Sequence, residues 1–241
     1  MNKSIRLFIL VVFFVACKGE SNKNTNAKSL LTMGQETELV DDIANAKPVN
    51  IKDIFLLLPN DVFLVEEISK ENRALLLNHV GEDKAFDISL TPIGVCDIKN
   101  GYLNLTGSQY DWEMCYWNLK DGGKLVATNN STEKGSEIRV FFYDDGKLTE
   151  DHNYKLGGNQ NYKLTDFIDI SQLSPESLKF AEKQFAKGAY HLYYKLPQNG
   201  TSITINIDIE DLIDDDENYD IFYEASKDVM LYWKNEKWER E

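Results

Sequence analysis

The sequence predicts an α+β fold made of two tandem units, each a helical block followed by an antiparallel meander. Three observations support this prediction. Apolar residues change from helical spacing to strict alternation at residue 86 and again at residue 190. Turns containing Gly or Asn separate the alternating stretches. Aromatic residues make up 12% of the chain, which favours β-structure and a well-filled core.

The first 16 residues have the pattern of a bacterial signal peptide. Lys3 and Arg6 precede the apolar run Leu7–Ala16, which is short of the about 20 residues that a spanning helix needs. The following residues, Phe14-Val15-Ala16-Cys17, resemble a lipobox, although Phe14 stands where an aliphatic residue is usual. The resemblance implies cleavage before Cys17 and lipidation of Cys17 with acyl chains such as palmitate. An ordinary export signal followed by a free thiol is the alternative.

We therefore expect a lipoprotein anchored in the cell envelope, in the outer membrane, with the lipid on Cys17 as its membrane partner. Residues 17–48 are expected to be the lipidated Cys and a flexible tether, because Lys18–Lys47 is poor in apolar residues and rich in Asn, Ser and Lys. The first helix-plus-meander unit is predicted at residues 49–152 and the second at residues 153–241. The two are expected to form one continuous globular domain.

In the first unit, Ile51–Leu58 is an apolar lead-in, Asn60 or Asp61 caps a short helix, and Ser69 caps a second helix that Gly81 ends. Alternation then predicts strands at Phe86–Leu90, Tyr102–Thr106, Tyr110–Leu119, Lys124–Asn129, Glu137–Tyr143 and Lys147–Asp151. The turns between them are Asp121-Gly122-Gly123 and Asp144-Asp145-Gly146, where Gly supplies a positive φ.

The second unit begins with a polar connector, Asn153–Lys163. Ser174-Pro175-Glu176 predicts a helix start, with Ser as the N-cap and Pro in the first position, and Gly188 predicts its end. Strands are expected at Tyr190–Leu196, Thr201–Ile209, Tyr219–Glu224, Val229–Trp233 and Lys237–Glu241.

The two halves share a hairpin pattern, because Tyr116–Asn129 parallels Tyr193–Asn206. The later Phe142–Lys147 parallels either Phe222-Tyr223 or Tyr232–Lys237, and the sequence leaves this choice open. The likeness fits either a duplication or independent hairpins.

A family resemblance rests on Pro59-Asn60-Asp61 after an apolar run, on the Tyr102–Asp145 meander and on the closing Tyr232–Trp238 segment. Together they resemble a Bacteroidetes family of small exported and lipoprotein domains of unknown function. The family usually starts closer to Met-Pro-Asp, whereas Leu58-Pro59-Asn60-Asp61 stands here. The resemblance implies a location in the cell envelope and the topology of the fold, but no activity. The repeat is also similar in outline to the lactamase-inhibitor-protein architecture, which suggests a binding surface by analogy.

Net charge argues against nucleic acid as a partner. The formal charge is −14, and loss of the presequence with Lys3 and Arg6 makes it about −16. The densest acids are a weak candidate for cation binding, with a solvated loop as the other interpretation; they are Asp214, Asp215, Asp216 and Glu217. An EF-hand loop does not fit, because no Gly occurs after residue 200.

Cysteine and histidine residues give weaker signals. Cys96 and Cys115 are a candidate disulfide in an exported protein, and two buried thiols are the alternative. The three histidines lack the paired spacing of a zinc site; they are His79, His152 and His191. We predict no metal site and no cofactor.

No motif predicts catalysis, since the chain has no nucleophile elbow, no P-loop and no G-x-G-x-x-G. Glu113, close to Trp112 and Trp117, is the least implausible catalytic acid, but strand alternation points Trp112 and Glu113 to opposite faces, as in a core Trp beside an outward acid. Five aromatic residues are candidates for a stacking platform for sugars or peptides, with core packing as the alternative: Trp117, Tyr193, Tyr194, Trp233 and Trp238.

These observations predict a non-catalytic, membrane-anchored module that binds an envelope protein or peptide. The alternatives are an inhibitor of an envelope or extracellular hydrolase, with the acidic loop meeting the enzyme, and a glycan hydrolase. A pocket with two carboxylates roughly 5–10 Å apart would favour the hydrolase. An exposed aromatic patch without convergent acids would favour ligand binding.

Overall fold

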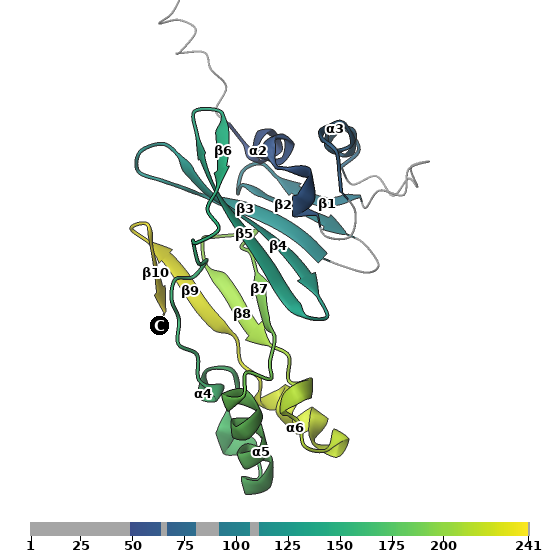
Figure 1. Ribbon diagram of the computed structural model, residues 1–241, viewed down its shortest axis with the longest axis vertical. Helices are drawn as coiled ribbons and strands as arrows, with labels where there is room; N and C mark the ends of the chain where they lie inside the picture. The colour runs from purple at the N-terminus through teal and green to yellow at the C-terminus, as the bar shows by residue number, and fades with distance from the viewer. Residues whose placement is uncertain (1–48, 64–66, 81–91, 107–110, 241) are drawn as a thin grey trace, which may run out of the picture. The chain divides into compact units, whose positions relative to one another are not determined.

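The computed structural model describes residues 49–63, 67–80, 92–106 and 111–240. They form two antiparallel sheets with flanking helices, the α+β class that the sequence predicts (Figure 1). The signal peptide, Cys17 and the tether lie outside the described residues, and so do the predicted strand Phe86–Leu90 and the helix end at Gly81.

The first sheet has six strands in chain order: β1 (Ile93–Asp97), β2 (Tyr102–Thr106), β3 (Asp111–Asn118), β4 (Lys124–Thr132), β5 (Gly135–Asp144) and β6 (Lys147–Glu150). Every neighbouring pair is antiparallel, and the predicted Gly turns join β3 to β4 and β5 to β6. Strand β1 was not predicted. Gly94 falls within it and its pairing shifts between Ile93 and Val95, so the alternation that marks a strand is broken there.

Helix α2 (Ile51–Leu57), the 3-10 turn η1 (Asn60–Val62) and α3 (Lys70–Leu77) precede this sheet. The interpretation of Ile51–Leu58 as a lead-in was wrong. Asn50 caps a helix there, with its side chain accepting the Lys52 N–H and Asp53 accepting the Asn50 N–H. The Ser69 cap of α3 is confirmed, because Ser69 Oγ accepts the Asn72 N–H at 3.2 Å.

The second half begins with α4 (Leu164–Phe167), η2 (Ile170–Gln172) and α5 (Pro175–Ala186). Ser174 caps α5 with Pro175 in the first turn, and Gly188 follows it at φ 74°, as predicted. The second sheet has the order β10-β9-β8-β7; its strands are β7 (Leu192–Lys195), β8 (Ile203–Ile207), β9 (Val229–Lys234) and β10 (Lys237–Arg240).

Between β8 and β9 the chain forms η3 (Glu210–Leu212), η4 (Asp216–Asn218) and α6 (Tyr219–Ala225). The strand predicted at Tyr219–Glu224 was wrong. Phe222 and Ala225 are both buried while their neighbours are exposed, and a spacing of three places both on one helical face. This result also settles the internal comparison, because the partner of the β5–β6 hairpin is Tyr232–Lys237, in the β9–β10 hairpin.

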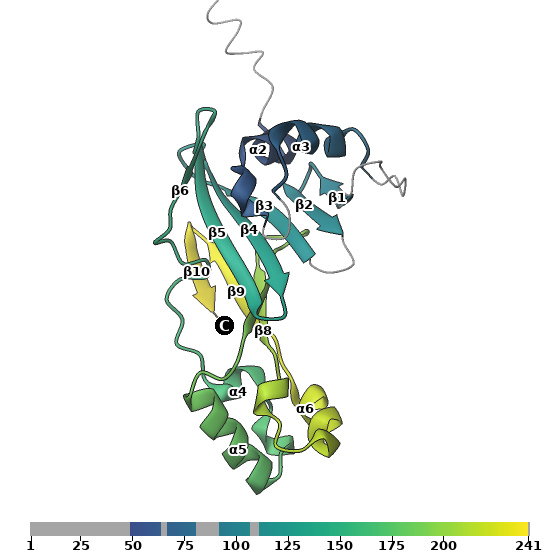
Figure 2. The ribbon, with the colours of Figure 1, turned by 45° about the vertical axis from the view of Figure 1, so that its right-hand side comes forward.

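Core residues lie on both faces of the six-stranded sheet, and Figure 2 shows α2 and α3 beside one of these faces. One face packs under α2 and α3 and includes Trp112, whose indole N–H donates to the Val62 carbonyl at 3.2 Å. The opposite face includes Cys115 and Trp117 and packs against the four-stranded sheet, and the same core cluster continues from that sheet into the second set of helices. The four-stranded sheet therefore meets a face of the first sheet, and the two pockets that share Tyr154 lie along this contact.

Candidate functional site

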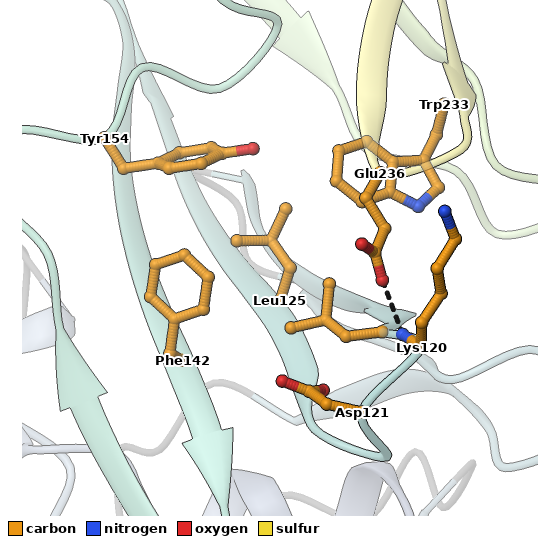
Figure 3. A pocket seen from close by; sticks show the side chains of 8 residues that line it. Lys120, Asp121, Leu125, Phe142, Tyr154, Trp233 and Glu236 are labelled. Atoms are coloured by element: carbon orange, nitrogen blue, oxygen red, sulfur yellow. Dashed lines mark hydrogen bonds between the residues drawn. The ribbon is translucent and has the colours of Figure 1, made fainter.

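Two pockets share the ring of Tyr154, which follows β6 in the polar connector. We call the first the Trp233 pocket. It has a volume of about 350 Å³ and is lined by Leu119, Lys120, Asp121, Leu125, Phe142, Tyr154, Trp233 and Glu236 (Figure 3). We call the second the tyrosine pocket. It has a volume of about 530 Å³ and is lined by Ser136, Ile138, Tyr154–Leu156, Gly158–Tyr162, Tyr190, Leu192 and Tyr194.

The Trp233 pocket has an apolar floor and a charged rim. Figure 3 shows Tyr154 and Phe142 on one side, Trp233 and Glu236 on the other, and Leu125 between them. Tyr154 packs edge-on against Phe142, with ring centroids 5.7 Å apart. An apolar floor with a few polar groups at the edge is typical of pockets that bind organic ligands.

Glu236 reaches this rim from an unusual backbone conformation. Asn235 and Glu236 have φ values of 53° and 63°, and Lys234 pairs with Lys237, so they form a two-residue type I′ turn. Gly usually fills the second position, because a side chain in the left-handed region costs about 1 kcal/mol. The Glu236 carboxylate accepts the Lys120 N–H at 2.5 Å, which links the β9–β10 turn to the β3–β4 turn. The residue with the strained backbone, Glu236, is thus also the residue whose carboxylate lies at the rim of the Trp233 pocket.

Asp121 supplies a second carboxylate at the same rim. Its Oδ1 accepts the Gly123 N–H at 3.0 Å, and both Asp121 and Glu236 are exposed. A general acid in a glycosidase is a buried carboxyl with a raised pKa. Two exposed carboxylates that accept backbone N–H groups suit the recognition of donors on a ligand better than proton transfer.

The tyrosine pocket combines phenol rings with amides. Tyr162 and Tyr194 both line it, and burial raises the pKa of both phenols. Gln160 donates to the Gly157 carbonyl at 2.8 Å, which holds the loop between Tyr154 and Tyr162. Tyr, Asn and Gly dominate antibody binding loops, because Tyr offers rigid amphipathic area and small polar residues offer adaptable hydrogen bonds.

The predicted aromatic platform is only partly assembled. Trp117, Trp233 and Trp238 meet, with ring centroids 4.8–6.2 Å apart. Trp117 is only 3% exposed and donates to the Thr201 carbonyl at 2.9 Å, so it is a core residue. Trp233 lines the first pocket, Tyr194 lines the second pocket, and the Tyr193 hydroxyl donates to the Glu133 carbonyl at 3.2 Å.

Glu113 holds the two sheets together and does not point outward to solvent as predicted. Its Oε1 accepts the Leu196 N–H at 2.7 Å and Asn129 Nδ2 at 3.0 Å, and its Oε2 accepts the Tyr102 hydroxyl at 2.9 Å. Burial raises the pKa of the Glu113 carboxyl, while these three hydrogen bonds act in the opposite direction. A carboxylate occupied by three donors of its own chain is a structural group.

The same contact protects the outer edge of β7. Asn129 Nδ2 donates to the Tyr194 carbonyl at 2.7 Å, and the Tyr194 N–H donates to Ser136 Oγ at 2.8 Å. With Glu113, three side chains of the first sheet therefore bind backbone groups of β7 and the residue after it. An edge strand is usually a site of unwanted pairing, and here side chains occupy its free hydrogen-bonding groups.

The sheet register contradicts the candidate disulfide between Cys96 and Cys115. Cys96 pairs with Leu103, which pairs with Met114, so Cys96 shares a face with Met114 and not with Cys115. The two residues are free thiols in opposite halves of the core. Burial raises the pKa of both.

The acids of the candidate cation site lie just before and within η4 (Asp216–Asn218). Asp215 accepts the Glu217 N–H and Asp214 accepts from Asn218 and Ser177, which turns these side chains into local caps, while Asp216 and Glu217 are exposed. Over the described ranges, no three Asp, Glu, His or Cys side chains are grouped as metal ligands would be. His152 Nδ1 lies 3.3 Å from Glu150 Oε1, with the His152 side chain exposed and that of Glu150 mostly buried.

Sequence reasoning missed Tyr154, the residue that both pockets share. It lies in a stretch assigned to a polar connector. The sequence Tyr154-Lys155-Leu156-Gly157-Gly158-Asn159-Gln160-Asn161-Tyr162 does carry a signal, since two tyrosines bracket a loop of Gly, Asn and Gln.

Comparison with known proteins found a similar solved structure. No family model matches the chain, and no curated protein matches it. A domain of an uncharacterized protein from Porphyromonas gingivalis W83 is similar in structure, with a TM-score of 0.55 and 12% sequence identity. The match covers 79% of this chain and 97% of that domain. The likeness shows a shared fold with a domain from a Bacteroidetes bacterium. Among the helices of the described residues, none is both long and apolar enough to cross a membrane.

Proposed function

We propose that this chain is a cell-envelope lipoprotein of the Bacteroidetes exported type, anchored through Cys17, that binds a protein or peptide partner without catalysis. The two pockets on either side of Tyr154 are the proposed binding site. The observation that carries the proposal is this pair of adjoining pockets, one floored by apolar side chains and one lined by tyrosines and amides.

An extended peptide has the chemistry that such a pair of pockets fits. An apolar side chain would bury against Leu125, Phe142 and Trp233, while peptide N–H groups would meet the carboxylates of Asp121 and Glu236. A neighbouring residue would reach the tyrosine pocket, where hydroxyl and amide groups pair with the peptide backbone. Tyr154 contributes one ring to both subsites.

The anchor supports the same proposal. A lipid on Cys17 would confine the module to the membrane surface and raise its concentration near an envelope partner. The structural role of Glu113 also weakens the hydrolase alternative, because the acid that stood out in the sequence has no free oxygen for a substrate.

Site-specific photo-crosslinking in cells that make the full-length protein tests the proposal. A benzophenone amino acid would replace Lys120 at the Trp233 pocket, Asn159 at the tyrosine pocket, or Lys179 on the exposed side of α5 as a control. The first two positions should capture the same envelope protein and the third should not. Y154A should remove most of the product from both pocket positions, because it deletes their shared wall.

Two results would overturn the proposal. Equal capture from Lys179 would mean that proximity, rather than the pockets, determines the product. Absence of any specific product at both pocket positions, with the protein folded and lipidated, would remove the binding role. Intact mass of the mature protein checks the anchor separately, since an unmodified Cys17 would refute the lipoprotein assignment alone.

A further inference from the structure

Helix α6 presents two tyrosines to solvent. Tyr219 is 44% exposed and Tyr223 is 67% exposed, and their rings stack at 6.4 Å with an interplanar angle of 13°. Ile221 between them is 44% exposed as well. Exposed aromatic residues grouped in this way often mark an interaction surface.

A pocket adjoins the two rings. It has a volume of about 530 Å³, and its walls come from the end of β8, from α6 and from the residues before β9. It is lined by Phe167, Asn206–Ile209, Tyr219, Tyr223 and Ser226–Asp228. It shares none of its lining residues with the Trp233 pocket or the tyrosine pocket.

The charge around this pocket is predominantly negative. Residues 208–228 contain ten acidic residues and a single basic one, Lys227. Lys227 Nζ donates to the Thr165 carbonyl at 2.7 Å, so this cation already has a partner within the chain. Asp208 and Asp228 lie in the same lining as the two tyrosines, and Asp208 Oδ1 also accepts the Glu210 N–H at 2.9 Å. The surface therefore complements a cation with a planar or apolar part.

We propose that this tyrosine face of α6 and its pocket dock an arginine side chain from a basic segment of a partner protein. A guanidinium stacks on a tyrosine ring and pairs with a carboxylate through parallel N–H groups. An ammonium offers neither the flat face nor the fork, so lysine is a poorer fit. The surrounding acids repel anionic surfaces and speed the encounter with a basic one.

Titration calorimetry of the full-length protein in detergent tests this proposal, with a blocked Gly-Arg-Gly-Arg-Gly-Arg-Gly peptide as the probe. Y219L/Y223L should weaken binding about fivefold to tenfold, because leucine keeps apolar area and removes the ring faces. D208N/D228N should weaken it about tenfold. The same peptide with lysine in place of arginine should bind the wild type several-fold more weakly.

A matched control separates docking from general attraction to an acidic protein. D144N/D145N removes two exposed charges from the β5–β6 turn, and Asn tolerates the positive φ of 42° at Asp145. It should change the affinity less than twofold. Equal weakening by both double neutralisations, or an unchanged affinity of Y219L/Y223L, would overturn the proposal. A thermal melt of each variant shows whether the fold is intact, which we expect since both tyrosines are exposed.

Discussion

Removing the Glu113 side chain should lower the free energy of unfolding, through the contact between the two sheets, by more than removing only its charge. E113A leaves three donors without their acceptor: the Leu196 N–H, Asn129 Nδ2 and the Tyr102 hydroxyl. A buried donor left unpaired costs about 1–3 kcal/mol. Because the Tyr102 hydroxyl can rotate to another acceptor, two donors remain, and we expect a total loss of about 2–6 kcal/mol in the free energy of unfolding.

E113Q keeps the shape of the side chain. Its carbonyl oxygen can still accept the two N–H donors of Leu196 and Asn129, and its amide can donate to the Tyr102 oxygen. We therefore expect E113Q to lie within about 1 kcal/mol of the wild type at neutral pH.

The pH dependence of the two proteins should differ. Burial raises the pKa of Glu113 in the folded state above its unfolded value. A carboxyl of this kind contributes its full stability below the unfolded pKa and loses it as the pH rises through the folded pKa. The wild type should therefore lose stability relative to E113Q as the pH rises across that interval.

Urea unfolding followed by far-ultraviolet circular dichroism at three pH values between about 4.5 and 7.5 measures both effects. A loss below about 1 kcal/mol for E113A would refute the structural role of the carboxylate. A larger loss for E113Q than for E113A would refute the hydrogen-bond assignment.

Three further variants or probes test other parts of the structure. E236G should raise the free energy of unfolding by about 0.5–1 kcal/mol by relieving the left-handed backbone, while lowering crosslinking at the Trp233 pocket; unchanged stability in urea would argue against the strain. R73K should lose about 2–3 kcal/mol, because the buried Arg73 fork donates to the Leu58 and Ile68 carbonyls and lysine lacks the fork; a wild-type urea midpoint would contradict this. Iodoacetamide should label Cys96 slowly and Cys115 only after unfolding, since burial raises the pKa of both thiols; a mass two hydrogens lower in the oxidised protein would indicate a disulfide instead.

Local signals in the sequence predicted those elements that local chemistry determines. Ser174 with Pro175 starts α5, and the Gly turn at Asp121–Gly123 closes a hairpin, because capping and positive φ act within a few residues. The segment Tyr219–Glu224 was misassigned because short runs of aromatic and apolar residues fit a strand as well as a helix. The helix is favoured by burial of Phe222 in the core cluster that also contains Cys115 and Trp117, and residues distant in sequence make that contact.

The candidate site depended still more on distant contacts. Trp233 stood out in the sequence as an aromatic residue, but its pocket needs Leu125 and Phe142 from the other sheet. Tyr154 reaches the same place through its contacts with Phe142 and Trp238. No spacing rule relates residues 84 positions apart, such as Tyr154 and Trp238. Composition could single out the Tyr-Gly-Asn loop as a surface for binding, but only the packing of the sheets could place it.

The polar contact at β7 connects stability to the proposed site. Tyr194 lines the tyrosine pocket, and both its carbonyl and its N–H are held by side chains of the first sheet, Asn129 and Ser136. Glu113 holds Leu196, two residues further on, in the same way. Side chains that are fixed before a ligand arrives lose less conformational freedom on binding, which raises affinity without any new contact. The carboxylate that looked most like a catalytic acid in the sequence therefore supports the proposed binding site indirectly, by keeping one wall of the tyrosine pocket in place.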